Sequence, residues 1–119
     1  MSIGLVTPPL RGGVYRVTSE TGLEQRLATA GWTVARLQAV EPRGFLVEVG
    51  TALGFPPYYG ANLDALADCL SDLDRPTALI WRGWAAAQLA EPRRWSTLLR
   101  VLRQASAGPV PFALVLAGA

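Results

Sequence analysis

The stretch FPPYYGANLDALADCLSDL, residues 55–73, holds a helix stop, a helix start and a row of carboxylates within nineteen residues. Pro56 and Pro57 lack backbone N–H donors and push the residues before them toward extended geometry, so no helix runs through them. Asn62 is a favoured N-cap residue, and the apolar spacing that follows it predicts a helix over residues 63–73. This stretch therefore predicts an aromatic loop between the end of one helix and the start of the next.

The helix expected over residues 63–73 has two unlike sides. At about 100° per residue, its leucines fall on one stripe, and Asp64, Asp68 and Asp72 fall roughly opposite. Like charges spaced by four residues repel each other, and the helix dipole favours only Asp64, in the first turn. The row thus lowers helix stability, and it indicates either an ordinary solvated face or a surface kept for binding.

Composition limits the possible classes of protein. The chain has 119 residues, of which 50% are hydrophobic and 17% charged, as expected for one folded domain with its own core. It has one cysteine and no histidine, which excludes an internal disulfide and catalysis by Ser-His-Asp or Cys-His sets from this chain's own side chains. No apolar run is long enough to cross a membrane, and residues 1–12 resemble a flexible tail rather than a signal peptide. We expect a soluble, cytoplasmic protein.

The remaining sequence alternates between strand and helix patterns. Strands are expected at residues 13–18, 32–40, 77–81 and 112–116. Helices are expected from a cap at Ser19 or Thr21 to Gly31, from Pro42 to Gly54, and over residues 63–73, 84–90 and 95–105. Helices between successive strands predict an α/β fold with a small parallel sheet of about four strands. Neither a GxGxxG nor a GxxxxGK[ST] phosphate loop occurs.

The net charge of +2 hides an asymmetry. Residues 61–74 carry four aspartates and no basic residue, so this segment is −4 and the remainder of the chain is +6. All eleven basic residues are arginines, and only the region from Arg93 to Arg103 concentrates them. A basic stripe of this kind indicates either a solvated face or nucleic-acid binding.

The segment PYYGANLDALADCL, residues 57–70, resembles the signature of the barstar family, intracellular protein inhibitors of a secreted microbial ribonuclease. Its Tyr, Gly, Asn, Asp and Cys positions are fixed, so the similarity is far more specific than a lone short motif. A looser similarity continues at LIWR, residues 79–82, and from residue 98 to 116. The family has a small α/β fold with a parallel sheet.

The resemblance also implies how the chain is organised. It covers about residues 34–116, so residues 34–119 are expected to form a barstar-like core. Residues 13–33, with one strand and one helix, are then an N-terminal addition found in longer barstar-like proteins. With the tail, the whole of residues 1–119 is expected to be a single domain.

In this family, the acidic helix and the loop before it block the active site of a basic ribonuclease, with a carboxylate in the place of an RNA phosphate. Carried over by position, Asp68 is the phosphate mimic, Asp64 a second charged contact and Tyr58 an aromatic contact. The full set of partner-binding residues expected is Tyr58, Gly60, Asn62, Leu63, Asp64, Ala67, Asp68, Asp72 and Leu73. The implied protein is a monomeric, cytoplasmic antitoxin or immunity protein in bacteria. It is not an enzyme, needs no cofactor or metal, and binds a basic secreted ribonuclease or toxin nuclease one to one, without a membrane or direct nucleic-acid contact.

Four features depart from the family pattern. The sequence pI is about 9.2, whereas barstar is strongly acidic. Two aromatic positions of the family are Ala67 and Leu73 here, and an acidic position of the last helix aligns with Gln104. Asp72 and Asp74 are candidates to compensate for these losses. These departures affect the expected identity of the target nuclease more than the expected mechanism by which its active site is blocked.

Two other functions remain open on the sequence. Carboxylates at i and i+4, such as Asp64 and Asp68, can share Mg²⁺ or Mn²⁺, as in a small metal-dependent enzyme. Alternatively, the arginines between Arg93 and Arg103 form an RNA-binding module, for which a steep salt dependence is expected.

Overall fold

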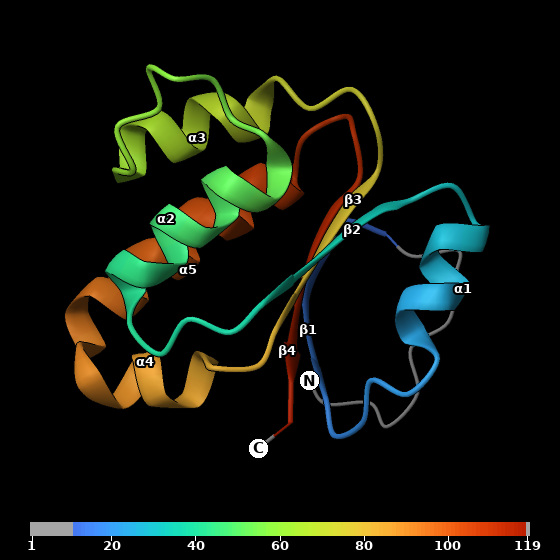
Figure 1. Ribbon diagram of the computed structural model, residues 1–119, viewed down its shortest axis with the longest axis horizontal. Helices are drawn as coiled ribbons and strands as arrows, with labels where there is room; N and C mark the ends of the chain where they lie inside the picture. The colour runs from blue at the N-terminus through green and yellow to red at the C-terminus, as the bar shows by residue number, and fades with distance from the viewer. Residues whose placement is uncertain (1–10, 119) are drawn as a thin grey trace.

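The computed structural model describes residues 11–118; residues 1–10 of the expected tail lie outside this part of the chain. This part of the chain contains four strands and five helices, arranged as in Figure 1. In chain order they are β1 (Gly13–Val17), α1 (Leu23–Thr29), β2 (Thr33–Leu37), α2 (Pro42–Leu53), α3 (Leu63–Ser71), β3 (Thr77–Trp81), α4 (Trp84–Ala90), α5 (Pro92–Ser106) and β4 (Phe112–Ala117).

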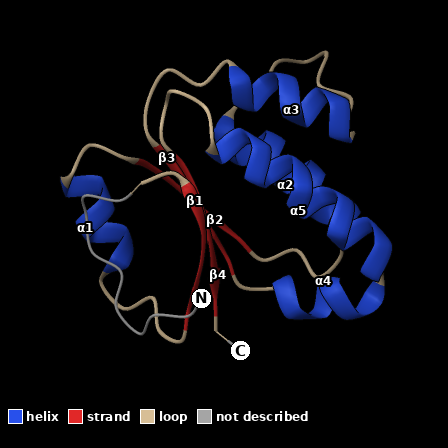
Figure 2. Cartoon of the chain, turned by 180° about the vertical axis from the view of Figure 1, so that it is seen from behind, coloured by secondary structure: helices blue, strands red, loops and turns tan. Residues whose placement is uncertain are grey.

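The strands form one parallel sheet in the order β1-β4-β3-β2. Helices α2 to α5 lie on one side of this sheet and α1 on the other, as both views show (Figures 1 and 2). The predicted α/β fold with about four parallel strands is therefore confirmed. Within residues 11–118, none of the helices combines the length and apolarity needed to cross a membrane.

The two central strands explain why helices must cover both faces. Every residue of β3 and of β4 is buried, which matches their nearly continuous apolar sequences. On the face toward α2 and α5, Trp81 packs against the rings of Phe45 and Trp95, with centroid distances of 4.4 and 5.6 Å. The aromatic residues of this layer are thus core residues, including Trp84, which is 5% exposed.

The opposite face is covered by α1. Leu23 and Leu27 of this helix are buried against small residues of the central strands, such as Ala78 and Ala113. The carboxylate of Glu20, just before the helix, forms ion pairs with Arg36 and Arg82, the latter at 3.4 Å. Apolar burial and ion pairs together attach β1 and α1 to the remaining strands.

Two predicted element boundaries in the N-terminal half are wrong: the end of β2 and the start of α1. Strand β2 ends at Leu37, before the expected residue 40, because the Glu48 carboxylate accepts the backbone N–H groups of Gln38 and Ala39 at 2.9 to 3.0 Å. Helix α1 begins after Gly22, which has a φ of 73°, and no side chain caps it. Ser19 and Thr21, the expected caps, bond to each other instead.

The last helix is longer than predicted. Helix α5 begins at Pro92, three residues before the expected start, because the first helical position accepts proline without losing a hydrogen bond. Helix α3 packs against α5 and lies beyond the α2 and α5 layer, away from the sheet (Figure 1). This arrangement leaves one long side of α3 facing solvent.

We expect Leu27→Ala to lower the free energy of unfolding by about 2–5 kcal/mol, because Leu27 is fully buried between α1 and the sheet. Leu89→Ala is the control: Leu89 is 83% exposed on α4, and its loss should change stability by less than about 0.5 kcal/mol. Urea unfolding followed by tryptophan fluorescence and circular dichroism measures both. A small loss for Leu27→Ala would show that α1 contributes little to the cooperative core.

Candidate functional site

The loop before α3 is anchored to the end of α2. Helix α2 stops at Gly54, whose φ of 66° is the left-handed conformation that glycine adopts readily, and the next residue, Phe55, donates its N–H to the Gly50 carbonyl at 2.9 Å. The Phe55 ring then meets the Tyr59 ring edge-on, with centroids 4.9 Å apart. The chain therefore turns back over the helix it has just left.

Tyr59 is the main anchor of this loop. Its hydroxyl donates to the Leu46 carbonyl at 2.7 Å, and its ring lies so close to Gly50 that a Cβ there would be 2.5 Å from the ring. Burial, with a smaller effect of Cys69, raises the pKa of Tyr59 to about 12. Its neighbour Tyr58 is 84% exposed. Tyr59 thus holds the loop on α2, whereas Tyr58 is available at the surface for contact with a partner.

The start of α3 is fixed by local hydrogen bonding. Asn62 accepts the Ala65 N–H with its side-chain oxygen at 2.8 Å, so the predicted N-cap is confirmed. Just before it, Ala61 has a φ of 51°, which is uncommon for a residue with a Cβ. The entry to the helix is therefore held in one defined geometry.

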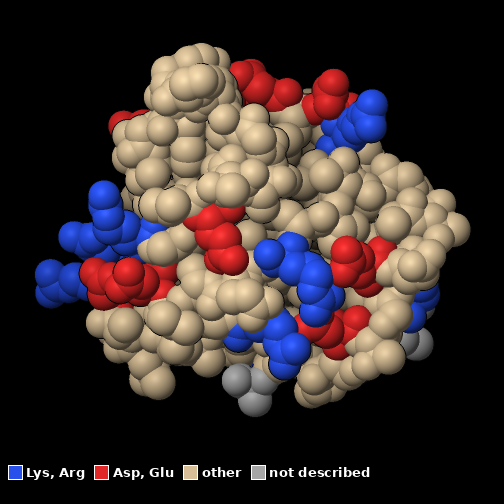
Figure 3. Space-filling view, in the orientation of Figure 1, with Lys and Arg blue, Asp and Glu red and all other residues tan. Residues whose placement is uncertain are grey.

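Helix α3 has the two sides that its sequence predicts. Leu66 and Leu70 are buried, whereas Asp64, Asp68 and Asp72 are exposed. None of the three aspartates forms an ion pair with another residue in the range 11–118. Figure 3 shows acidic side chains along the upper edge of the molecule, where α3 lies in Figure 1.

The predicted C-terminal end of α3 is wrong by two residues. The helix ends at Ser71, so Asp72 is the C-cap and Leu73 lies beyond it. Tighter i to i−3 bonds close the last turn: Asp72 N–H to the Cys69 carbonyl and Leu73 N–H to the Leu70 carbonyl, both at 3.3 Å. Asp72 remains on the exposed side, while Leu73 is half-buried.

The expected partner-binding residues lie on one continuous segment from the loop to the end of α3. Seven are exposed and two, Leu63 and Leu73, are half-buried. The seven exposed ones are Tyr58, Gly60, Asn62, Asp64, Ala67, Asp68 and Asp72. We call these nine residues the α3 surface.

Three of the positions that depart from the family pattern lie close together in the structure. Ala67, Leu73 and Gln104 line one hollow of about 240 Å³ between α3 and α5. Its other lining residues are Leu70, Ser71, Val101, Ala105, Gly108, Pro109 and Val110. The sequence pattern does not reveal this hollow, because the hollow depends on how two helices far apart in the chain pack together.

Cys69 lies on the half-buried flank of α3. Burial, together with the carboxylates of Asp72 and Asp68, raises the pKa of its thiol. A raised pKa keeps the thiol protonated near neutral pH, where it is a poor nucleophile. Within residues 11–118, no three His, Cys, Asp or Glu side chains are grouped so that they could hold a metal ion.

The fold and the α3 surface define a small parallel α/β protein that presents an acidic helix edge, held on a second layer of helices. Residues 33–117 match the family model described as Barstar (barnase inhibitor), so the chain belongs to the barstar family. The resemblance seen in the sequence is confirmed. β1 and α1 precede the matched residues, and the division into addition and core stays a prediction.

We expect Gly50→Ala to destabilise the protein by about 1–3 kcal/mol, because the new methyl group would overlap the Tyr59 ring. Alanine normally stabilises a helix relative to glycine, so the sign is informative. Gly44→Ala, in the same helix, is the matched control: its Cβ would meet neighbours at 3.4 Å and beyond, and it should be neutral or stabilising. Equal effects of the two substitutions in urea unfolding would contradict the anchoring role of Tyr59.

Tyr59→Phe should change how stability depends on alkaline pH. Because folding raises the Tyr59 pKa from 10.0 to about 12, the unfolded chain loses the phenol proton first, and this part of the stability falls as pH rises from about 10 to 12. The variant should show a shallower fall over that range, together with a loss of about 0.5–1.5 kcal/mol near neutral pH from the missing hydrogen bond. Tyr58→Phe, at an exposed position, serves as the control. Identical alkaline profiles for Tyr59→Phe and wild type would contradict this assignment.

Proposed function

We propose that this protein inhibits a basic, barnase-like ribonuclease by covering the nuclease active site with the α3 surface. The observation that carries the proposal is the row of three exposed aspartates, each without an ion pair among the described residues, on a helix of a barstar-family chain. Such a protein needs no chemistry of its own. It acts by occupying the place of the substrate.

The repulsion among the three aspartates of α3 supports this proposal. Carboxylates that repel each other along one helix gain when cationic side chains of a partner arrive between them. Asp68 lies in the middle of the row, so we assign it the place of a substrate phosphate, where charge-assisted hydrogen bonds are strongest. Asp64 and Asp72 flank it, and Tyr58 adds an exposed aromatic contact beside them.

Rigidity supports the same assignment. The loop is held by Tyr59 on α2, and α3 is capped by Asn62 and buried along Leu66 and Leu70. A surface already in its binding geometry loses little conformational entropy on association. The apolar side of α3 therefore contributes to binding without touching the partner.

The hollow beside α3 fits a target that differs from the family's usual one. Where the family has two aromatic residues and an acid, this chain has Ala67, Leu73 and Gln104, which together line the hollow. A nuclease side chain that is bulky and apolar would fill the space left by these smaller residues. We accordingly assign the choice of target to this hollow and the blocking of the active site to Asp68. The partner, in this proposal, is a nuclease of the same bacterium, bound one to one in the cytoplasm.

The two alternative functions gain no support from the geometry. Asp64 and Asp68 are not joined by further acidic side chains in a group that could hold a metal ion within the described residues. Of the arginines proposed for RNA binding, Arg94 is paired with Glu91 at 3.3 Å. Figure 3 shows basic and acidic side chains interspersed on the visible face rather than one continuous basic surface. Protein inhibition of a nuclease is the better account of the exposed aspartates.

Asp68→Asn should weaken inhibition of the target nuclease by about thirtyfold or more, since loss of one partner from a buried, hydrogen-bonded charge pair costs about 2 kcal/mol or more. Glu24→Gln is the control, because it removes one exposed carboxylate from α1, on the opposite side of the sheet from α3. Ribonuclease assays and calorimetry with barnase and other basic bacterial ribonucleases measure both variants. Equal inhibition by wild type and Asp68→Asn would remove Asp68 from the site, and inhibition of none of these nucleases would contradict the proposed function.

A further inference from the structure

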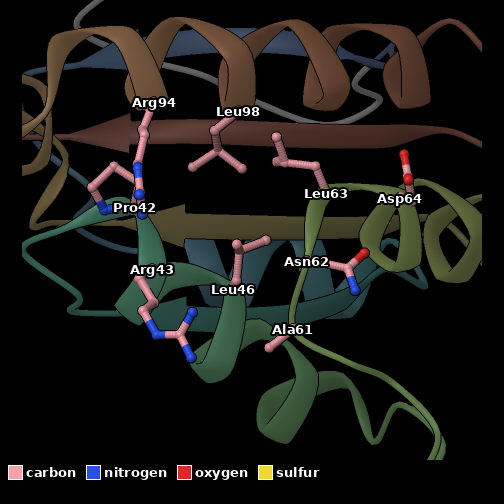
Figure 4. A pocket seen from close by; sticks show the side chains of 9 residues that line it. All are labelled: Pro42, Arg43, Leu46, Ala61, Asn62, Leu63, Asp64, Arg94 and Leu98. Carbon is pink, nitrogen blue, oxygen red and sulfur yellow. The ribbon is translucent and has the colours of Figure 1, made fainter.

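A second hollow, of about 490 Å³, lies where the N-terminal ends of α2, α3 and α5 meet. Figure 4 shows its lining: side chains from the first turns of α2 and α5 face the loop that enters α3. The lining residues are Pro42, Arg43, Leu46, Ala61, Asn62, Leu63, Asp64, Arg94 and Leu98. We call it the N-terminal hollow.

The walls of the N-terminal hollow carry opposite charges. Arg43 and Arg94 stand on one side and Asp64 on the other, with the apolar Leu46 and Leu98 between them (Figure 4). Among residues 11–118, Arg43 forms no ion pair, and the recorded pair of Arg94 is that of its Nε with Glu91 at 3.3 Å. Positive and negative groups thus face each other across an open space rather than pairing.

The hollow is continuous with the α3 surface, because Asn62, Leu63 and Asp64 belong to both. A partner large enough to cover Asp64 and Asp68 also covers part of this hollow. Enclosing a guanidinium that lacks a counter-ion is costly, since the charge loses its water without gaining a partner. A tightly bound partner must therefore bring an anionic group to Arg43, which has no ion pair within residues 11–118, whereas Arg94 already has Glu91 as a partner of its Nε.

We propose that the N-terminal hollow receives an acidic side chain, Asp or Glu, of the nuclease that the α3 surface blocks. This inference rests on the proposed function and adds the charge pattern of the partner. The acid would bond to Arg43 and Arg94, its aliphatic part would lie on Leu46 and Leu98, and a basic group beside it would face Asp64. The proposed partner thus has basic side chains over its active site and one acidic side chain next to them, opposite the N-terminal hollow.

Such an arrangement gives selectivity among basic nucleases. A nuclease that is positively charged over the whole contact area would place like charges against Arg43 and Arg94 and would be rejected. A nuclease with one acid at the matching place would be accepted. The two arginines would thus discriminate between targets, while Asp68 supplies the contact that all targets share.

The test uses the full chain, barnase and any other basic ribonuclease that the wild-type protein inhibits. Arg43→Gln and Arg94→Gln should each weaken binding about tenfold or more in calorimetry and inhibition assays, the range expected when a charge pair at an interface is broken. Arg93→Gln is the matched control, because it removes the same charge from the first turn of α5 but does not line the hollow. It should bind as tightly as wild type, or slightly more tightly to a basic partner. Thermal unfolding checks that all three variants are folded.

A charge swap identifies the partner group. Arg43→Glu should abolish tight binding, and a single Asp→Lys or Glu→Lys substitution on the nuclease should restore it. Binding by Arg43→Gln and Arg94→Gln that equals or exceeds that of wild type, while Asp68→Asn fails to bind, would overturn this inference and leave the proposed function intact. If the wild-type protein binds none of the nucleases, the proposed function fails and this inference fails with it.

Discussion

The need to cover both faces of a parallel sheet determines how this molecule is built. β3 and β4 are buried along their whole length, so side chains pointing either way from them require helices. One face presents large residues such as Trp81 and Leu114, and α2 to α5 cover it, with α2 and α5 directly on the strands. The other face presents Ala78 and Ala113 together with Ile80 and Val115, and the short helix α1 covers these residues with Leu23 and Leu27.

The same constraint places the candidate site far from the sheet. Helices α2 and α5 occupy the space directly on the sheet, and α3 packs on α5 as an outer layer (Figure 1). A helix in that position buries a single stripe, here Leu66 and Leu70, and leaves its opposite side in water. The exposed aspartates thus follow from the layering, and the anchoring of Tyr59 on Gly50 fixes the loop that leads to them.

The sequence predicts features whose causes are local. Asn62 as an N-cap, Gly54 as the end of α2, and the apolar strands each depend on neighbouring residues, and the structure confirms them. The features that were missed depend on contacts between distant residues. Glu48 ends β2 early by accepting backbone N–H groups nine and ten residues before it, and both hollows need the packing of α3 on α5. No periodicity in one segment contains that information.

The positive net charge does not prevent recognition of a basic partner, because screening makes electrostatics local. At physiological salt, exposed charges separated by more than about 8 Å interact weakly. The aspartates from Asp64 to Asp72 span about 12 Å along the helix axis, and the segment from residue 61 to 74 carries no basic residue. In the proposed complex, a nuclease docked on α3 therefore meets a negative surface, although the remainder of the chain is +6.

The same screening weakens the repulsion between a basic partner and the positive remainder of the chain. The contacts on α3 then determine how slowly the proposed complex dissociates. Affinity in the proposed complex therefore depends on the fit of a few carboxylates and on the charge pattern beside them more than on the net charge of the chain.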